Sequence, residues 1–309
     1  MLTDVERYRI PVPHADLEIS LLDWGGNGPL ALLHHANGFC AGMWGVVAQG
    51  LRRRFRVIAM DARGHGDSDK PQGNEHYRWE NFGLDAAAVA DVLVARHGPV
   101  TLGLGHSFGG TALILAAVQR PDLFEHLVLL DPIVMPTVVN ESPEIRAERT
   151  DSLVEAARGR RHVFESREEA YDGWKGRAIF THWDPRALEL YVTEGLADRS
   201  DGSVELKCPG EVEAAIFAAG AGADVMGKLG GLEAPTLIVW ASGGNFSRVH
   251  FEELAARMQR GEVITAEVGH LIPMEQPEWV VRQVLRFNAR SGSPAGSSRS
   301  NPLEENVPS

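Results

Sequence analysis

Gly105-His106-Ser107-Phe108-Gly109 decides the fold, because it fits the pattern G-x-S-x-G and stands between two regular segments. The apolar run 100–104 before it predicts a buried strand, and the run 111–118 after it is typical of a helix. A serine between a strand and a helix lies on a sharp turn, and the flanking glycines remove the Cβ clashes of that turn. This context predicts that Ser107 is a nucleophile rather than part of a chance glycine-rich turn.

Short apolar runs alternate with helical patterns on both sides of this motif. Runs of the kind found in strands buried on both faces lie at 17–23, 30–33, 57–60, 100–104, 127–130, 236–240 and 263–266. Helices are expected at 81–96, 107–119, 251–259 and 278–288. The alternation predicts the α/β class, with a doubly wound and mostly parallel sheet.

The alternation stops between residues 135 and 232, where charged and aromatic residues and helical patterns dominate. We interpret 135–232 as a helical cap domain inserted into the core. The core then consists of 1–134 and 233–290. Residues 291–309 are rich in Ser, Pro and Gly and carry little apolar surface, which predicts a disordered tail.

Composition excludes some classes of function. The 309 residues include 30 Lys and Arg against 42 Asp and Glu, a formal net charge of -12. Such a chain repels phosphate backbones and anionic membrane surfaces. No apolar run approaches the roughly 20 residues of a membrane span, the N-terminus does not resemble a signal peptide, and the spacing of Cys40 and Cys208 suggests no disulfide. We therefore expect a cytoplasmic protein that acts on a small molecule without cofactor or metal, and a homodimer stays open.

A serine nucleophile needs a neighbouring base, and neutral imidazole serves at pH 7. The sequence holds 12 histidines, of which His270 stands out because it follows the last expected strand, in the segment 268–273. A loop after a strand of the same sheet can present its side chain to Ser107. His270 is therefore the predicted base.

Four motifs together resemble the α/β-hydrolase family. They occur in the family's order and cover the core from about residue 20 to 288: His35-Ala36-Asn37-Gly38-Phe39, Asp61-Ala62-Arg63-Gly64-His65-Gly66-Asp67-Ser68, the elbow at Ser107, and Gly269-His270 with Glu275-Gln276-Pro277-Glu278. In this family, epoxide hydrolases and haloalkane dehalogenases have an aspartate at the nucleophile position. The serine here implies an esterase, lipase, lactonase, thioesterase, C–C hydrolase or cofactor-free perhydrolase. The charges of the second motif are interpreted as holding its loop together.

The resemblance also implies an oxyanion hole made of two backbone N–H groups. One belongs to Phe108, the residue after the nucleophile. The other comes from the loop 35–39, which departs from the usual His-Gly-x because Ala36 replaces the glycine. We assign this donor to Asn37, with Gly38 as the alternative. Asn37 can instead be a turn residue whose side chain caps its own loop.

The acid of the expected triad departs from the usual position. The family normally places it after the strand 236–240, but the loop 241–247 contains no Asp or Glu. Asn245 could orient the histidine but supplies no charge. Some branches, including zearalenone-type lactonases and certain lipases, carry the acid after the preceding core strand, where this chain has Asp131. We therefore predict a triad of Ser107, His270 and Asp131; the alternative is that Asp131 only caps its strand.

The predicted activity is hydrolysis of an ester-like bond (carboxylester, lactone or thioester) in a small hydrophobic substrate, through an acyl-enzyme. Residues expected to line the substrate pocket are Gly38, His106, Met43, Trp44 and Trp183, with Trp174 and Phe180 as further cap aromatics that otherwise build the cap's own core. A C–C bond hydrolase or perhydrolase on the same triad remains open. So do a non-catalytic ligand receptor, favoured by the missing acid after Trp240, and a protein-interaction module that uses the cap surface.

Overall fold

An eight-stranded sheet forms the centre of the molecule in this computed structural model, which describes residues 4–135, 143–220 and 222–291. The strand order is β1-β2-β4-β3-β5-β6-β10-β11. The strands are β1 Glu6–Val12, β2 Leu17–Asp23, β3 Leu30–His34, β4 Arg56–Met60, β5 Val100–His106, β6 Phe124–Leu130, β10 Thr236–Gly243 and β11 Gly261–Gly269. β2 pairs antiparallel with both β1 and β4. The remaining neighbours in this order, β4-β3-β5-β6-β10-β11, pair in parallel. The predicted fold class is confirmed.

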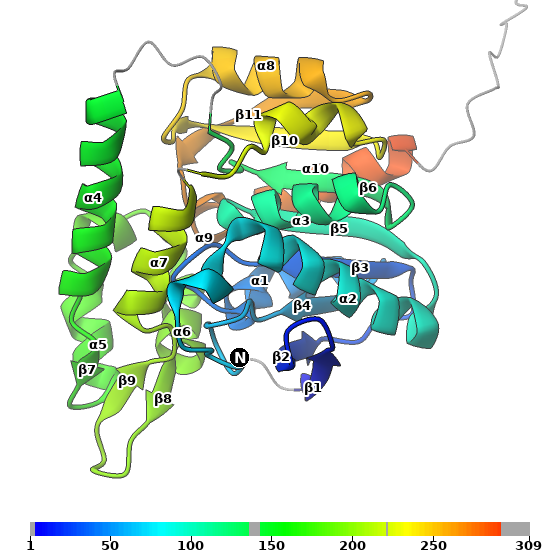
Figure 1. The fold of residues 1–309 in the computed structure, drawn as a ribbon. Coiled ribbons are helices and arrows are strands. Elements are labelled where there is room, and N and C mark those ends of the chain that lie inside the picture. The colour runs from blue at the N-terminus through cyan, green and yellow to red at the C-terminus, as the bar shows by residue number, and fades with distance from the viewer. Residues whose placement is uncertain (1–3, 136–142, 221, 292–309) are drawn as a thin grey trace, which may run out of the picture.

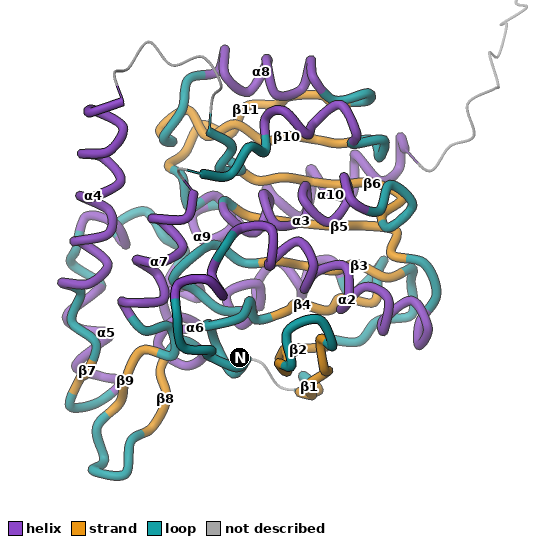
Figure 2. The backbone as a smooth tube through the Cα atoms, viewed as in Figure 1, coloured by secondary structure: helices purple, strands orange, loops and turns teal. Residues whose placement is uncertain are grey.

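Successive side chains of the inner strands bury on opposite faces of the sheet, as the pleat requires. In β3, Leu30 and Leu32 join one apolar cluster, whereas Ala31 and Leu33 join another. Helices cover both faces (Figures 1 and 2). The first cluster includes residues of α2 (Trp79–His97), α3 (Phe108–Gln119) and α8 (Arg248–Arg257), and the second includes residues of α1 (Gly45–Leu51) and α10 (Pro277–Ser291).

Residues 143–220, which lie between β6 and β10 in the chain, form a separate group of elements beside the sheet (Figure 1). Its helices are α4 Pro143–Gly159, α5 Arg167–Trp174, α6 Pro185–Glu194 and α7 Gly210–Gly220. A three-stranded antiparallel sheet accompanies them, made of β7 Val163–Phe164, β9 Val204–Leu206 and β8 Leu196–Asp198. We call residues 143–220 the cap segment. The sequence indicated helices here but not this small sheet, because strands of two or three residues show no period.

The residues that follow the cap segment return to the core before residue 232. Met226 and Leu229 of the 3-10 helix η4 (Met226–Gly231) are buried in the same cluster as α3 and α8. Val225 and Leu232 on either side of it are also in that cluster. The boundary expected at 232 therefore falls inside a segment that packs on the sheet.

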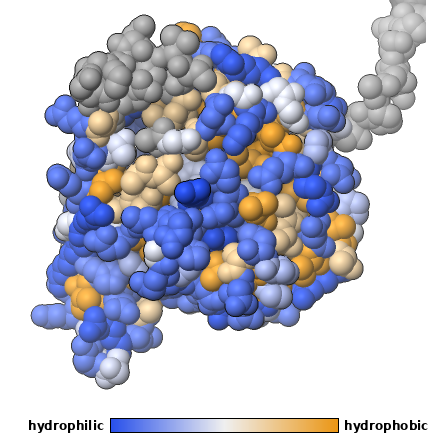
Figure 3. Space-filling model, in the orientation of Figure 1, coloured by the Kyte–Doolittle hydropathy of each residue, from blue (hydrophilic) through white to orange (hydrophobic). Residues whose placement is uncertain are grey.

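Further features bear on the cellular location that we expected from the sequence. No helix within the described residues is both long and apolar enough to cross a membrane. Cys40 and Cys208 are free and buried. Hydrophilic residues cover most of the face in Figure 3, and apolar residues occupy smaller areas between them.

Buried polar contacts hold the loop that follows β4. The Asp61 carboxylate accepts hydrogen bonds from the backbone N–H of Ala41 at 2.7 Å and of Asp67 at 3.0 Å. The Arg63 guanidinium makes two bonds of 2.6 Å to the Asp85 carboxylate, and both side chains are only 1% exposed. This bidentate pair connects the loop to α2.

Replacing Arg63 by Met tests this connection. The buried Asp85 carboxylate would lose its counter-charge, and breaking a buried pair costs about 3–5 kcal/mol. We expect the free energy of unfolding, measured by urea denaturation, to fall by that amount. The control is Arg120→Met, which removes an exposed pair with Asp91 and should cost less than about 1 kcal/mol. Equal effects of the two substitutions would contradict the importance of the buried pair.

Candidate active site

Ser107 lies on the turn between β5 and α3, in a backbone conformation that few non-glycine residues adopt, with φ 54° and ψ −124°. Its N–H donates to the carbonyl of Leu130 at 2.8 Å, which ties the turn to β6. The turn leaves no space for side chains at two neighbouring positions. A Cβ at Gly105 would lie 2.6 Å from the Cα of Gly110, and a Cβ at Gly109 would lie 2.3 Å from the carbonyl oxygen of His35.

Three side chains from three strand ends form one hydrogen-bonded chain. Ser107 Oγ lies 2.8 Å from Nε2 of His270, and Nδ1 of His270 lies 2.6 Å from Oδ2 of Asp131. Ser107, Asp131 and His270 directly follow the parallel strands β5, β6 and β11. The carboxyl ends of parallel strands share one edge of the sheet, which is where ligand sites of open α/β sheets form.

Asp131 is fully buried and is held in place on both carboxylate oxygens. Oδ1 accepts the backbone N–H of Ala241 at 3.1 Å, while Oδ2 faces His270. Its backbone has a φ of 43°, a left-handed conformation that lets the chain turn away from the sheet. A Cβ built on Gly244 would lie 2.5 Å from Oδ2. The loop after β10 thus has a glycine where the Asp131 carboxylate needs space.

His106 forms a hydrogen bond with the backbone of His270. Its Nε2 donates to the backbone carbonyl of His270 at 2.9 Å. Burial lowers the pKa of His106 to about 3, so its ring is neutral at pH 7. His106 therefore positions the loop of His270, and the structure does not place it on the wall of the cavity that contains Ser107.

The loop after β3 presents two backbone N–H groups beside the serine turn. The N–H of Gly38 is already used, because it donates to Nε2 of His65 at 3.1 Å. The N–H groups of Asn37 and Phe108 donate to no acceptor within the part of the chain that the structure describes. The Asn37 side chain donates from Nδ2 to the carbonyl of Glu213 at 3.1 Å, so it is bound to the cap segment rather than to its own loop.

A cavity of about 650 Å³ contains Ser107 and His270 at its wall, between the sheet edge and the cap segment. Aromatic and aliphatic side chains make up most of its lining, and they include Phe39, Trp79, Leu153, Phe164, Trp174, Phe180 and Phe217. The charged side chains in the lining all come from the cap segment and are Arg149, Arg160, Arg161, Arg177 and Glu213. The sequence analysis did not name these five, because no motif links them.

Four residues expected in the pocket lie elsewhere. Gly38 is not on the cavity wall, because the Glu213 side chain covers its Cα. Trp44 is buried in the core cluster under α1, and Met43 and Trp183 are buried in the apolar cluster of the cap segment. Proximity to the loop 35–39 in sequence misled the assignment of Met43 and Trp44. Trp174 and Phe180, named as further cap aromatics, do line the cavity.

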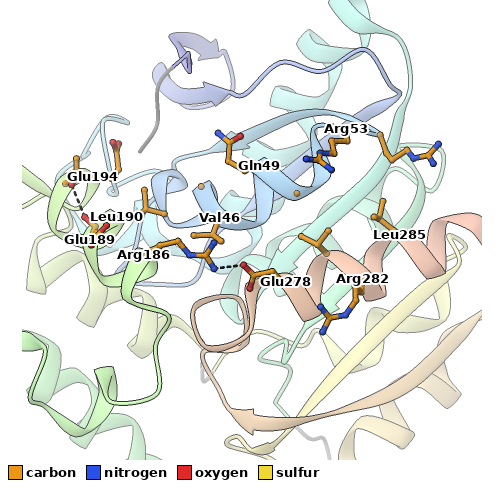
Figure 4. Close-up of a pocket in the computed structure, with 15 residues that line it drawn as sticks. Val46, Gln49, Arg53, Arg186, Glu189, Leu190, Glu194, Glu278, Arg282 and Leu285 are labelled. Atoms are coloured by element: carbon orange, nitrogen blue, oxygen red, sulfur yellow. Dashed lines mark hydrogen bonds and ion pairs between the residues drawn. The ribbon is translucent and has the colours of Figure 1, made fainter.

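A second hollow of about 1050 Å³ lies between α1, α6 and α10 (Figure 4). An ion pair between Arg186 and Glu278 crosses it, as the dashed line in Figure 4 shows. Its lining contains none of Ser107, His270 and Asp131. The chemistry therefore belongs to the smaller cavity. Within the described residues, no three His, Cys, Asp or Glu side chains are grouped to hold a metal ion.

Two sequence relatives and one solved structure are similar to this chain over part or most of its length. The 3-oxoadipate enol-lactonase 1 of Acinetobacter baylyi is 26% identical over 269 residues, which cover 82% of this chain and 85% of that protein. The 2-(acetamidomethylene)succinate hydrolase of Mesorhizobium japonicum is 31% identical over 140 residues, and the match spans only 45% of the length of either protein. A crystal structure of E-2-(acetamidomethylene)succinate hydrolase superposes with a TM-score of 0.77 at 22% identity, covering 92% of this chain and 98% of that one. The first two proteins are a lactonase and a hydrolase by name, and the crystal structure has the same fold.

The family assignment rests on a match that covers most of the chain. A family model described as "Alpha/beta hydrolase family" matches residues 31–283, which include the sheet from β3 to β11 and the loops that carry Ser107, Asp131 and His270. Ser107 lies between a strand and a helix, as its motif predicted. The chain belongs to the alpha/beta hydrolase family.

Proposed function

We propose that the protein is a serine hydrolase that cleaves an ester-like bond of a small substrate through an acyl-enzyme. The observation that carries this proposal is the unbroken chain of hydrogen bonds from Ser107 Oγ through His270 to Asp131, at 2.8 and 2.6 Å. A serine bonded to an imidazole that is bonded in turn to a buried carboxylate is the arrangement that activates a hydroxyl nucleophile. The adjoining cavity has room for a small organic molecule.

In this mechanism His270 acts first as a base and then as an acid. Its Nε2 takes the proton of Ser107 as Oγ attacks the acyl carbon, and gives it to the leaving oxygen or sulfur. Water then loses a proton to the same nitrogen as it attacks the acyl carbon. The bond between Ser107 Oγ and the acyl carbon breaks, Oγ takes the proton back from Nε2, and the acid product leaves. Asp131 holds Nδ1 of His270 in the protonated tautomer and stabilises the imidazolium that forms in each step.

The tetrahedral intermediate needs donors for its oxyanion. We assign these to the backbone N–H groups of Asn37 and Phe108, which have no acceptor among the described residues. Phe108 is the first residue of α3, so its N–H also carries the positive end of the helix dipole. Such preorganised donors contribute about 10²–10³ each in rate. Gly38 is set aside as a donor because its N–H is bonded to His65.

Other readings of the same site differ in how well the contacts support them. A lactone falls inside the proposed class, and one relative is an enol-lactonase by name. A C–C bond hydrolase or a perhydrolase would use the same three side chains, and analysis of products from a substrate panel separates them. A non-catalytic receptor would not need Ser107 within 2.8 Å of His270, nor the buried Asp131 behind it.

Substitution of Ser107 by Ala tests the nucleophile. We expect the wild type to hydrolyse members of a chain-length series of 4-nitrophenyl esters and to react with a fluorophosphonate probe. The substituted protein should lose at least about 10³-fold in kcat/KM, because the nucleophile is gone, and should not be labelled. Retention of ester cleavage by the Ala protein would contradict the serine mechanism.

Substitution of Asp131 by Asn tests the acid. The amide keeps the shape of the carboxylate but removes its charge and favours the wrong tautomer of His270, so kcat should fall by about 10³- to 10⁴-fold. The measurement is ester turnover, with circular dichroism to show that the protein is folded. Asp67→Asn is the control, because Asp67 pairs with Lys207 on the surface and has no contact with His270. Nearly unchanged turnover in Asp131→Asn would remove Asp131 from the mechanism.

Gly244→Ala tests the space that Asp131 needs. The new Cβ would lie 2.5 Å from Asp131 Oδ2 and must displace either the carboxylate or the loop. We expect turnover to fall by at least about tenfold, since a misplacement of about 1 Å can cost 10²-fold. The matched control is Gly230→Ala, where no atom lies within 4 Å of the new Cβ. The same turnover in both variants would show that the loop yields without moving Asp131.

A further inference from the structure

The cavity beside Ser107 has a charge opposite to that of the whole chain. The formal net charge of the protein is -12, yet four arginines and one glutamate are the charged residues in the cavity lining. Net charge governs long-range attraction, whereas a binding site responds to the charges within a few ångströms. The local excess of positive charge therefore indicates what the cavity accepts.

Arg160 and Arg161 have acidic partners, and Arg149 is not free either. Arg160 Nη2 lies 2.8 Å from Oε2 of Glu213, the one acidic residue of the lining. Arg161 makes two bonds of 2.6 and 2.8 Å to Glu169 and stacks over Phe164. These two guanidinium groups are largely neutralised by the protein itself. Burial raises the pKa of Glu213 while Arg160 lowers it, so Glu213 adds little negative charge to the cavity beyond its pair.

Arg177 differs from these two. Its Nε donates to the backbone carbonyl of Gly173 at 3.1 Å, which fixes the guanidinium against the end of α5. None of the acidic side chains in the described part of the chain pairs with it. Its two terminal nitrogens are therefore left to bind an anion from the cavity. The guanidinium stays charged at any pH at which the protein is folded.

The cavity lining contains apolar side chains as well as the charged Arg177. Aromatic side chains of the cap segment, among them Trp174 and Phe180, stack on each other at a ring separation of 5.8 Å next to Arg177 in the chain. Arg177 is exposed, so water solvates its guanidinium when the cavity is empty, and a carboxylate of the substrate would exchange that water for charge-assisted hydrogen bonds. A carboxylate matches the planar fork of a guanidinium and can accept two parallel bonds from it.

We propose that the substrate is an ester-like compound that also carries a carboxylate, and that Arg177 binds this carboxylate while the scissile carbonyl lies at Ser107. This inference rests on the proposed hydrolase function and narrows its substrate class. It replaces the purely hydrophobic substrate expected from the sequence with an amphipathic one. The apolar lining contacts the carbon skeleton, and the charge at Arg177 sets its orientation.

Matched substrate pairs test the proposal in wild type. Mono(4-nitrophenyl) adipate and its methyl-capped diester differ only in the carboxylate on the acyl side. The pair 4-acetoxybenzoate and methyl 4-acetoxybenzoate places the difference on the leaving group. We expect the charged member of at least one pair to have the higher kcat/KM, by about two- to fivefold, because water screens an ion pair with an exposed guanidinium. Equal rates, or preference for the neutral member in both pairs, would overturn the proposal.

Substitution of Arg177 by Gln tests whether Arg177 causes the preference for the charged ester. Arg177→Gln should lower kcat/KM for the charged ester more than for the neutral ester, so that the advantage of the charged ester disappears, and Arg177→Lys should restore part of that advantage. The control is Arg282→Gln, which makes the same change in net charge in the other hollow and should leave both rates unchanged. An equal loss on charged and neutral esters, or no loss on either, would show that Arg177 does not bind the carboxylate.

A binding measurement separates this proposal from the proposed activity. Adipate should bind to the Ser107→Ala protein in isothermal titration calorimetry, dimethyl adipate should bind more weakly, and Arg177→Gln should weaken adipate binding by about two- to fivefold. Adipate binding without cleavage of any ester would contradict the hydrolase mechanism and keep the anion site. Cleavage of neutral esters without adipate binding would contradict the anion site and keep the hydrolase mechanism.

Discussion

The hydrogen bond between Asp131 and His270 is the constraint on which the proposed site depends. A fully buried carboxylate is costly to desolvate unless its oxygens are paired. Here one oxygen accepts the Ala241 N–H and the other faces the imidazole. The Ala241 N–H and the His270 imidazole reach the carboxylate because β6, β10 and β11 are adjacent and parallel. A slip in register of any of these strands would leave the charge without a partner, so the sheet and the site must form together.

The position of the acid also shapes the connections around it. Because Asp131 ends β6, the chain must leave the sheet there, and its positive φ turns it towards the cap segment. The loop after β10, where the family normally has its acid, then has to make room. Gly244 provides that room, since even a methyl group would meet Oδ2. The position of the Asp131 carboxylate thus accounts for both the turn after β6 and the glycine after β10.

The sequence predicted what is continuous along the chain and missed what is assembled from distant parts. Inner strands such as β5 and β6 are apolar runs, so they could be recognised. β1 was missed, although Tyr8, Ile10 and Val12 alternate in the way of a half-buried strand. The serine turn was recognisable from its local motif. The cavity lining was not, because α4, α5, α6 and α7 each contribute one or a few residues, and no local pattern marks a side chain that faces a cavity.

The arginines of the cavity show why overall charge is a weak guide to a ligand. An acidic chain repels anions at long range, but that repulsion is screened within about 10 Å at ordinary ionic strength. Inside the cavity, where apolar rings exclude much of the water, each nearby charge acts more strongly. Arg160 and Arg161 are balanced by Glu213 and Glu169, which lowers the cost of placing them there. Arg177 is exposed and has no such partner among the described residues, so its guanidinium is available to the carboxylate of a molecule that enters the cavity.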